Sequence, residues 1–109
     1  MFGNTDKAQH VYRVDRFVVP NSIKAEFLDK VRQTHEVLRV QPGFLQDMLL
    51  EQHAGGEHRI VTIVEWEDEG AVASAKFNVQ AMQREMNFNP QEFLAQNDIR
   101  AEIGNYQHI

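Results

Sequence analysis

The chain of 109 residues contains no cysteine, and basic residues are outnumbered by acidic ones. Without cysteine there can be neither a disulfide scaffold nor a thiolate metal site. The 11 Lys and Arg against 16 Asp and Glu give a formal charge of -5. Such a charge opposes binding to the phosphate backbone of nucleic acids, and we expect no nucleic-acid partner.

Long apolar runs are also missing. No stretch approaches the roughly 20 apolar residues that a bilayer-spanning helix needs. The first residues, MFGNTDKAQ, have neither the basic start nor the apolar centre of a secretory signal. We therefore expect a cytoplasmic protein with no membrane partner.

The remaining composition, 42% hydrophobic and 25% charged residues in 12.6 kDa, is typical of one globular domain with one core. Residues 1–9 are polar and have no period, so we expect a flexible lead-in there. Residues 10–109 form the expected single domain.

The first half of that domain predicts a strand followed by a helix. HVYRVDRFVV alternates over residues 10–19 and is rich in β-forming side chains, and Pro20 ends the strand. Asn21 or Ser22 can then cap a helix over residues 22–40. One apolar stripe supports this helix: Ile23, Phe27, Val31, His35 and Leu38.

QPGF at 41–44 is a turn signal, and two β-rich runs then flank AGG, which predicts a hairpin of strands 44–53 and 57–67. Asp68 is a candidate N-cap for a helix over residues 69–86. An apolar stripe of this second helix contains Val72, Ala75, Val79, Met82 and Met86.

The chain closes with a loop that holds one helical turn near Pro90–Leu94, and then with DIRAEIGNYQHI as a fourth strand. The order of elements is βαββαβ, which predicts a ferredoxin-like α+β fold with a four-stranded antiparallel sheet. Helices can cover only one face of this sheet, yet IVTIV at residues 60–64 offers apolar side chains to both faces, as do Leu49 and Leu50. We therefore predict a homodimer that packs sheet against sheet.

Three segments together resemble the antibiotic biosynthesis monooxygenase (ABM) domain family of the dimeric α/β-barrel superfamily. They are VDRFVVP in the first strand, PGF before the second, and VEWEDEGAVASAKF across the third strand and second helix. The resemblance covers about residues 10–109 and implies dimerisation into an α/β barrel. It also implies that the activity has to be inferred from the site, because the fold hosts several functions.

The resemblance offers two enzymatic branches. Its haem-degrading branch has an Asn in the first strand, a Trp at the end of the third and a His ligand in the second helix, where this chain has Asp15, Trp66 and Lys76. Its other branch oxidises phenols or quinols with O₂ and without metal or flavin. We expect this second chemistry, with no cofactor and no metal, because Lys76 cannot replace the imidazole ligand.

Cofactor-free oxygenation requires a pocket that binds a flat ring and favours its phenolate. We expect Trp66, His35 and Asp15 as catalytic residues, with His35 or Asp15 as the proton acceptor, and Arg13 to stabilise the anion. The other candidate substrate-binding residues are aromatic or contain sulfur: Phe44, Met48, Phe77, Met82 and Met86.

Each of these candidates has a structural alternative. Trp66 can be packing alone, His35 a hydrogen-bonded core residue, and the methionines core filler. Asp15 can form a salt bridge with Arg13 or Arg16 at a dimer interface.

His53 and His58 are expected to face each other across the hairpin, but two ligands are too few for a structural zinc site. His10 and His108 lie at strand ends. The alternative function is a non-catalytic dimeric module that binds or senses an aromatic small molecule. An open cavity beside Trp66 would favour the enzyme, and a cavity filled by Met and Phe would favour the module.

Overall fold

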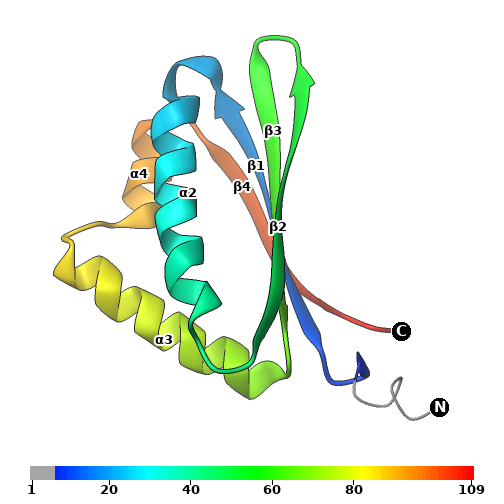
Figure 1. The fold of residues 1–109 in the computed structure, drawn as a ribbon. Helices are drawn as coiled ribbons and strands as arrows, with labels where there is room; N and C mark the ends of the chain where they lie inside the picture. The colour runs from blue at the N-terminus through cyan, green and yellow to red at the C-terminus, as the bar shows by residue number, and fades with distance from the viewer. Residues whose placement is uncertain (1–6) are drawn as a thin grey trace.

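The computed structural model describes residues 7–109. Its elements follow the predicted order, with a short 3₁₀ helix added after the first strand and a full helix in place of the turn predicted near Pro90–Leu94 (Figure 1): β1 (Val11–Pro20), η1 (Asn21–Ile23), α2 (Lys24–Arg39), β2 (Phe44–Ala54), β3 (Glu57–Trp66), α3 (Glu69–Glu85), α4 (Pro90–Gln96) and β4 (Arg100–Gln107). Most of the lead-in predicted over residues 1–9 lies outside the described residues. None of the described helices is long and apolar enough to cross a membrane.

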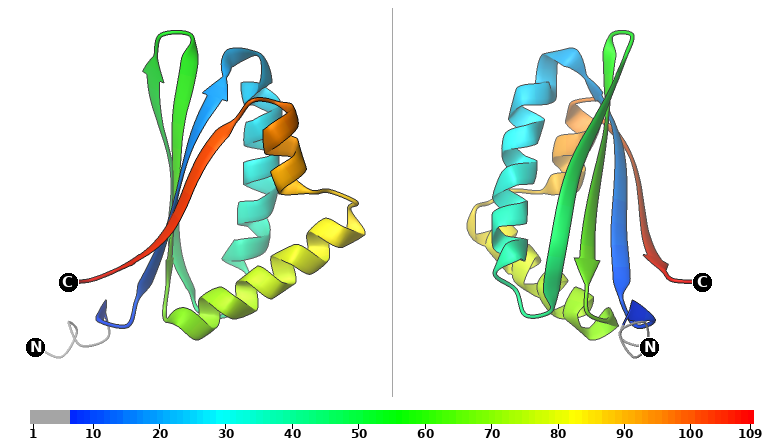
Figure 2. Two further views of the ribbon diagram at one scale, coloured as in Figure 1. Left: turned by 180° about the vertical axis from the view of Figure 1, so that it is seen from behind. Right: turned by 45° about the vertical axis from the view of Figure 1, so that its right-hand side comes forward.

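The sheet has four strands in the order β2-β3-β1-β4, and every neighbouring pair is antiparallel. All the helices lie against one face of this sheet, and the views in Figure 2 leave the other face uncovered. This arrangement confirms the predicted ferredoxin-like α+β fold. It also gives the molecule one covered and one open face, which hold different sets of side chains.

The covered face carries two apolar clusters at opposite ends of the sheet. One contains Val19, Phe27, Ile60 and Ile99, and the other contains Val64, Trp66 and Ala75. Thr62 lies between Ile60 and Val64 on the same face of β3 and pairs with Asp15 of β1. Because polar residues occupy the middle of the covered face, this is where a polar site can form.

The open face carries apolar side chains on three strands. The alternation of side chains puts Val14, Ile63 and Met48 in one row and Val61 and Leu50 in the next. Met48 is 47% exposed and Leu50 49%. The two-faced apolar pattern predicted for residues 60–64 is therefore present, with Ile60 and Val64 buried under the helices.

Of the two helix N-caps predicted from the sequence, one is present in the structure. Asp68 caps α3 as predicted, since its side chain accepts a 2.9 Å hydrogen bond from the amide of Ala71. The cap predicted at Asn21 or Ser22 is wrong, because the chain enters α2 through η1 without a side-chain cap. The side-chain oxygen of Asn21 instead lies 2.7 Å from Nε2 of His58.

Strand β2 departs from regular pairing at its start. Phe44 pairs with Trp66, but Gln46 pairs with Glu65, so one extra residue, Leu45, is accommodated between them. Such a β-bulge changes which side chains of a strand share a face. Here it brings Phe44 and Asp47, which are an odd number of residues apart, to the same covered face.

Candidate functional site

A cavity of about 460 Å³ lies between the helices and the covered face of the sheet. This volume is within the range of small-molecule sites, which is about 300–1,000 Å³. Its walls come from β1, β3, α2, α3 and the segment around α4. A larger hollow of about 930 Å³ between α3 and α4 is more open and lined mainly by polar side chains such as Gln83 and Gln96, so the less open cavity of about 460 Å³ is the better candidate site.

Trp66 both packs and lines this cavity. It is 3% exposed at the end of β3 and belongs to the cluster with Val64 and Ala75. Phe44 supports it from the neighbouring strand, with ring centroids 5.8 Å apart at an angle of 86°. The edge-to-face geometry holds the indole in place, and the indole also lines the cavity.

Arg13 and Asp15 bring a charged pair into the cavity lining. Nε of Arg13 lies 2.7 Å from Oδ1 of Asp15, and both side chains come from the covered face of β1. The pairing offsets the cost of holding a carboxylate on a partly buried sheet. The structural alternative for Asp15 placed its salt bridge at a dimer interface. That location is wrong, because the pair lies on the sheet face that the helices cover.

His35 projects from α2 toward the same cavity and is 5% exposed. Its Nδ1 lies 2.9 Å from Oδ2 of Asp47 on β2, and the same oxygen accepts a 3.0 Å hydrogen bond from Nε of Arg39. Burial alone raises the pKa of the Asp47 carboxyl, but the hydrogen bonds from His35 and Arg39 outweigh burial and hold that pKa below its ordinary value. Asp47 is therefore a carboxylate at neutral pH.

Four of the predicted site residues thus line one cavity: Arg13, Asp15, His35 and Trp66. Phe44 lies behind Trp66 and is not part of the lining. The predicted methionines and Phe77 are also absent from the cavity lining. Met48 lies on the open face, Met82 is half-buried outside the lining, and Phe77 and Met86 are 67% and 51% exposed.

Sequence reasoning missed Asp47 and Thr62. Thr62 could have been found from the alternation of β3, since it stands between two buried residues of the covered face, Ile60 and Val64. Asp47 could not, because regular alternation from Phe44 assigns it to the opposite face and only the bulge reverses this assignment.

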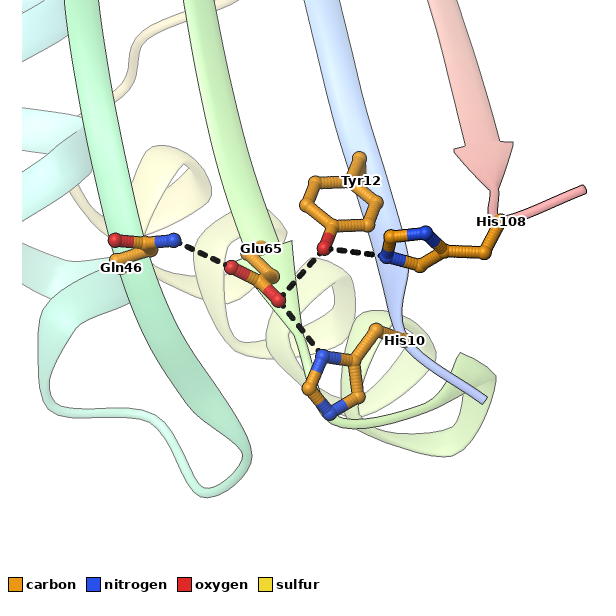
Figure 3. Close-up of polar contacts among 5 residues, drawn as sticks. All are labelled: His10, Tyr12, Gln46, Glu65 and His108. Carbon is orange, nitrogen blue, oxygen red and sulfur yellow. Dashed lines mark hydrogen bonds and ion pairs between the residues drawn. The ribbon is translucent and has the colours of Figure 1, made fainter. Parts of the chain in front are cut away.

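A second polar cluster lies on the open face, where the start of β1 pairs with the end of β4 (Figure 3). Glu65 is 6% exposed at its centre. Its Oε2 lies 2.7 Å from Nδ1 of His10 and accepts a 2.8 Å hydrogen bond from the hydroxyl of Tyr12, while Oε1 accepts a 2.6 Å bond from Gln46. The hydroxyl of Tyr12 also lies 2.8 Å from Nε2 of His108.

The cluster stabilises Glu65 in its charged form. Burial raises the pKa of this carboxyl, but hydrogen bonds from Gln46, His10 and Tyr12 outweigh burial and lower it. The hydrogen bond from Tyr12 to Glu65 is also the largest cause of a raised pKa of the Tyr12 hydroxyl. The strand-end histidines His10 and His108 are therefore parts of one network.

The hairpin histidines face each other as predicted, with ring centroids of His53 and His58 4.8 Å apart. Nδ1 of His58 lies 2.7 Å from Glu51, and Nε2 lies equally close to Asn21. Over residues 7–109 no group of three or more His, Cys, Asp or Glu side chains is placed to hold a metal ion.

The model of one protein family, described as antibiotic biosynthesis monooxygenase, matches residues 11–78. This match spans more than half of the chain. The chain belongs to the antibiotic biosynthesis monooxygenase family. A sequence comparison with curated proteins gives no match.

Solved structures share the fold of this ABM chain. The cofactor-independent oxygenase SnoaB from Streptomyces nogalater has a TM-score of 0.62 and 24% identity, covering 94% of this chain and 95% of SnoaB. A conserved protein from Methanosarcina mazei Go1 has a TM-score of 0.72 and 18% identity over 97% and 99% of the chains. A candidate monooxygenase from Shewanella loihica PV-4 has a TM-score of 0.69 and 17% identity over 93% and 95%.

The lining residues of this ABM domain do not supply the ligand expected for haem. Asp15, Trp66 and Lys76, which occupy the positions that the haem-degrading branch uses, all line the cavity. Lys76 is exposed on α3, and its side chain is not the imidazole that the haem-degrading branch is expected to use. The histidine in the cavity lining is His35. It comes from α2 rather than from α3, and its Nδ1 lies 2.9 Å from Oδ2 of Asp47.

Proposed function

We propose that this ABM domain is a cofactor-independent monooxygenase that oxidises a phenolic or quinol-type aromatic compound with O₂. The observation that carries the proposal is the cavity of about 460 Å³, which has the indole of Trp66 in one wall and His35 and Asp15 in its lining. Membership of the family and the fold shared with a cofactor-independent oxygenase support the same chemistry.

The cavity residues have separate roles in this proposal. The flat ring of the substrate stacks on Trp66, because aromatic side chains favour offset and edge contacts with other rings. His35 accepts the phenolic proton, and Arg13 stabilises the phenolate by charge. Asp15 holds Arg13 through the 2.7 Å ion pair and is a second proton acceptor.

The phenolate supplies the electrons for the reaction. It passes one electron to O₂, and the resulting pair of radicals combines to form a C–O bond to the ring carbon. The O–O bond then breaks, so that one oxygen atom remains in the product as a carbonyl and the other leaves as water with two hydrogen atoms of the substrate. A bound substrate that fills the cavity displaces bulk water and so protects these intermediates.

The alternative function, a non-catalytic binding module, has less support. A module of this kind was expected to have its cavity filled by Met and Phe side chains. Here Phe17, Phe27, Phe88 and Phe93 line the cavity, but a volume of about 460 Å³ remains beside them, and Met48, Met82 and Met86 lie outside the lining. The space beside Trp66 is therefore open to a ligand, which favours the enzyme.

The domain is further proposed to act as a homodimer. The open face carries apolar side chains on three strands, including Met48 and Leu50, which are 47% and 49% exposed. Apolar faces larger than a few hundred Å² are seldom left in water. A second copy that packs its own open face against this one would bury both.

Oxygen uptake tests the proposed activity. Purified protein without added metal or flavin is mixed with a panel of hydroquinones and anthrone-like compounds, and wild type is compared with the Trp66→Phe and His35→Ala variants. The proposal expects uptake by the wild type and a loss of uptake in both variants. Saturable quenching of Trp66 fluorescence without any uptake would identify a binding module instead.

A further inference from the structure

The bulge at the start of β2 controls what lies beneath His35. In a regular strand that begins with Phe44 on the covered face, Gln46 and Met48 would follow on that face and Asp47 would point to the open face. The extra residue reverses this order, so that Asp47 pairs with Val64 on the covered face. Bulges are frequent next to active sites, where they redirect one side chain.

The redirected carboxylate fixes where the His35 ring carries its proton. Because the pKa of Asp47 is lowered by its hydrogen bonds, both of its oxygens are acceptors at neutral pH. Nδ1 of His35, 2.9 Å from Oδ2, must therefore carry the hydrogen of this contact. In a neutral imidazole the other nitrogen, Nε2, is then an unprotonated lone pair.

The same contact determines which edge of the ring faces the cavity. His35 lines the cavity, whereas Asp47 does not, so the edge opposite Nδ1 is the one that remains for the cavity. In residues 7–109 no buried side-chain nitrogen or oxygen is both sealed and without a hydrogen-bond partner. Nε2 has no partner among these residues, and it therefore contacts open space.

We infer that Asp47 is a positioning residue that holds His35 as the Nδ1–H tautomer, with Nε2 presented to the cavity as the proton acceptor. Arg39 completes the arrangement, because its 3.0 Å hydrogen bond to Oδ2 keeps the carboxylate charged and in place. The use of this base rests on the proposed oxygenase, but the orientation of the ring does not.

His35 is better suited to this role than Asp15. Oδ1 of Asp15 already lies 2.7 Å from Nε of Arg13, so this oxygen is engaged in an ion pair. Nε2 of His35 has a free lone pair on the cavity side. In the proposed step the phenolic O–H bond breaks and its proton binds to Nε2, and the same proton is later returned to the peroxide oxygen that leaves as water.

Nitrogen-15 NMR of the histidine rings tests the orientation without any turnover. Uniformly labelled wild type is recorded at a pH where His35 is neutral, and its signals are assigned by their absence in a His35→Gln variant. We expect a protonated Nδ1 and an unprotonated Nε2. Asp47→Asn, in which the side chain keeps its shape but can now donate, should remove this preference or invert it.

Two further variants control the experiment. Arg39→Gln removes the second hydrogen bond to Oδ2 but leaves the carboxylate, so the Nδ1–H tautomer should persist. Asp29→Asn makes the same chemical change as Asp47→Asn at an exposed position of α2 and should leave the His35 signals unchanged. A wild-type spectrum with hydrogen on Nε2, or an unchanged tautomer in Asp47→Asn, would overturn the inference.

Kinetics then separate this inference from the proposed function. With a quinol that the wild type oxidises, Asp47→Asn should lower kcat by about tenfold or more, while the concentration needed to quench Trp66 stays within about twofold. Full kcat in Asp47→Asn would refute the positioning role and leave the oxygenase intact. No uptake by any variant or by the wild type would refute the oxygenase, and the tautomer would still be decided by NMR.

Discussion

Replacement of Glu65 by glutamine should destabilise the protein in a way that depends on pH. The substitution keeps the shape of the side chain but removes the charge that receives hydrogen bonds from Gln46, Tyr12 and His10. Hydrogen bonds to charged groups contribute about 1.5–3 kcal/mol each, and the new amide can keep only part of them. We expect the free energy of unfolding at pH 7 to fall by about 2 kcal/mol.

The sign of the pH dependence follows from the lowered pKa of Glu65. A carboxyl whose pKa is lower in the folded state stabilises the fold fully above its ordinary value of 4.5 and loses this effect as the pH falls through the folded value. The protonated carboxyl of the wild type then resembles the amide of the variant. The difference between the two proteins should therefore be constant near neutral pH and shrink below about pH 4.5.

Urea unfolding followed by the fluorescence of Trp66 measures both quantities. Trp66 is the single tryptophan and is 3% exposed, so its emission reports unfolding of the core. Protein concentration must be equal in all samples, because the proposed dimerisation would make apparent stability depend on it. Glu36→Gln, at an exposed position of α2, is the control and should change stability by less than about 0.5 kcal/mol. The stabilising role of the Glu65 network would be refuted if Glu65→Gln lowers the free energy of unfolding by no more than the control does. It would also be refuted if the loss in Glu65→Gln stays unchanged down to about pH 3.5.

Three further predictions address packing and assembly. Trp66→Phe should cost about 1–2 kcal/mol of unfolding free energy in urea, while the affinity for a planar phenol, measured by titration calorimetry, should fall further than stability does. Ile63→Lys should convert a dimer of about twice 12.6 kDa into a folded monomer in light scattering, and a wild type that is already monomeric at micromolar concentration would contradict the dimer. Gly43→Ala should cost about 1–3 kcal/mol more unfolding free energy than Gly55→Ala in thermal unfolding. Both glycines have a positive φ, but only at Gly43 would a new Cβ clash with Ala71. Equal losses in the two variants would show that backbone strain alone matters.

The strands and the main helices could be predicted because each rests on a local signal. The turn at QPGF is one example, since Gly43 adopts a φ of 85° that few other residues tolerate. The cap at Asp68 is another. Helix α4 was underestimated as a single turn, although Asn89 caps it and Pro90 occupies its first turn, which are both recognisable start signals.

The site was harder to predict because its geometry depends on the bulge in β2. Phe44 and Met48 were expected in the pocket because one is aromatic and the other contains sulfur, and period-two alternation would place both on one face. The extra residue moves Met48 to the open face and Asp47 beneath His35. No feature of a single sequence marks Leu45 as the inserted position, so this error could not be corrected without the structure.

The Glu65 network escaped prediction for a different reason. His10 and His108 are nearly the whole chain apart in sequence, and each looks unremarkable at its strand end. They meet near Tyr12 only because β4 pairs with β1, with Gln107 opposite Val11. Long-range pairing of this kind sets a side-chain cluster that local periodicity does not encode.

Isotope labelling of the product tests the central proposal most directly. Wild-type protein free of added metal and flavin is incubated with a quinol or anthrone-type substrate under ¹⁸O₂ in ordinary water, and the product is analysed by mass spectrometry. A monooxygenase of the proposed kind places one ¹⁸O atom in each product molecule and releases the other in water, and Trp66→Phe and His35→Ala should greatly reduce the labelled product. A product without ¹⁸O across a broad panel of such substrates would contradict the proposed function.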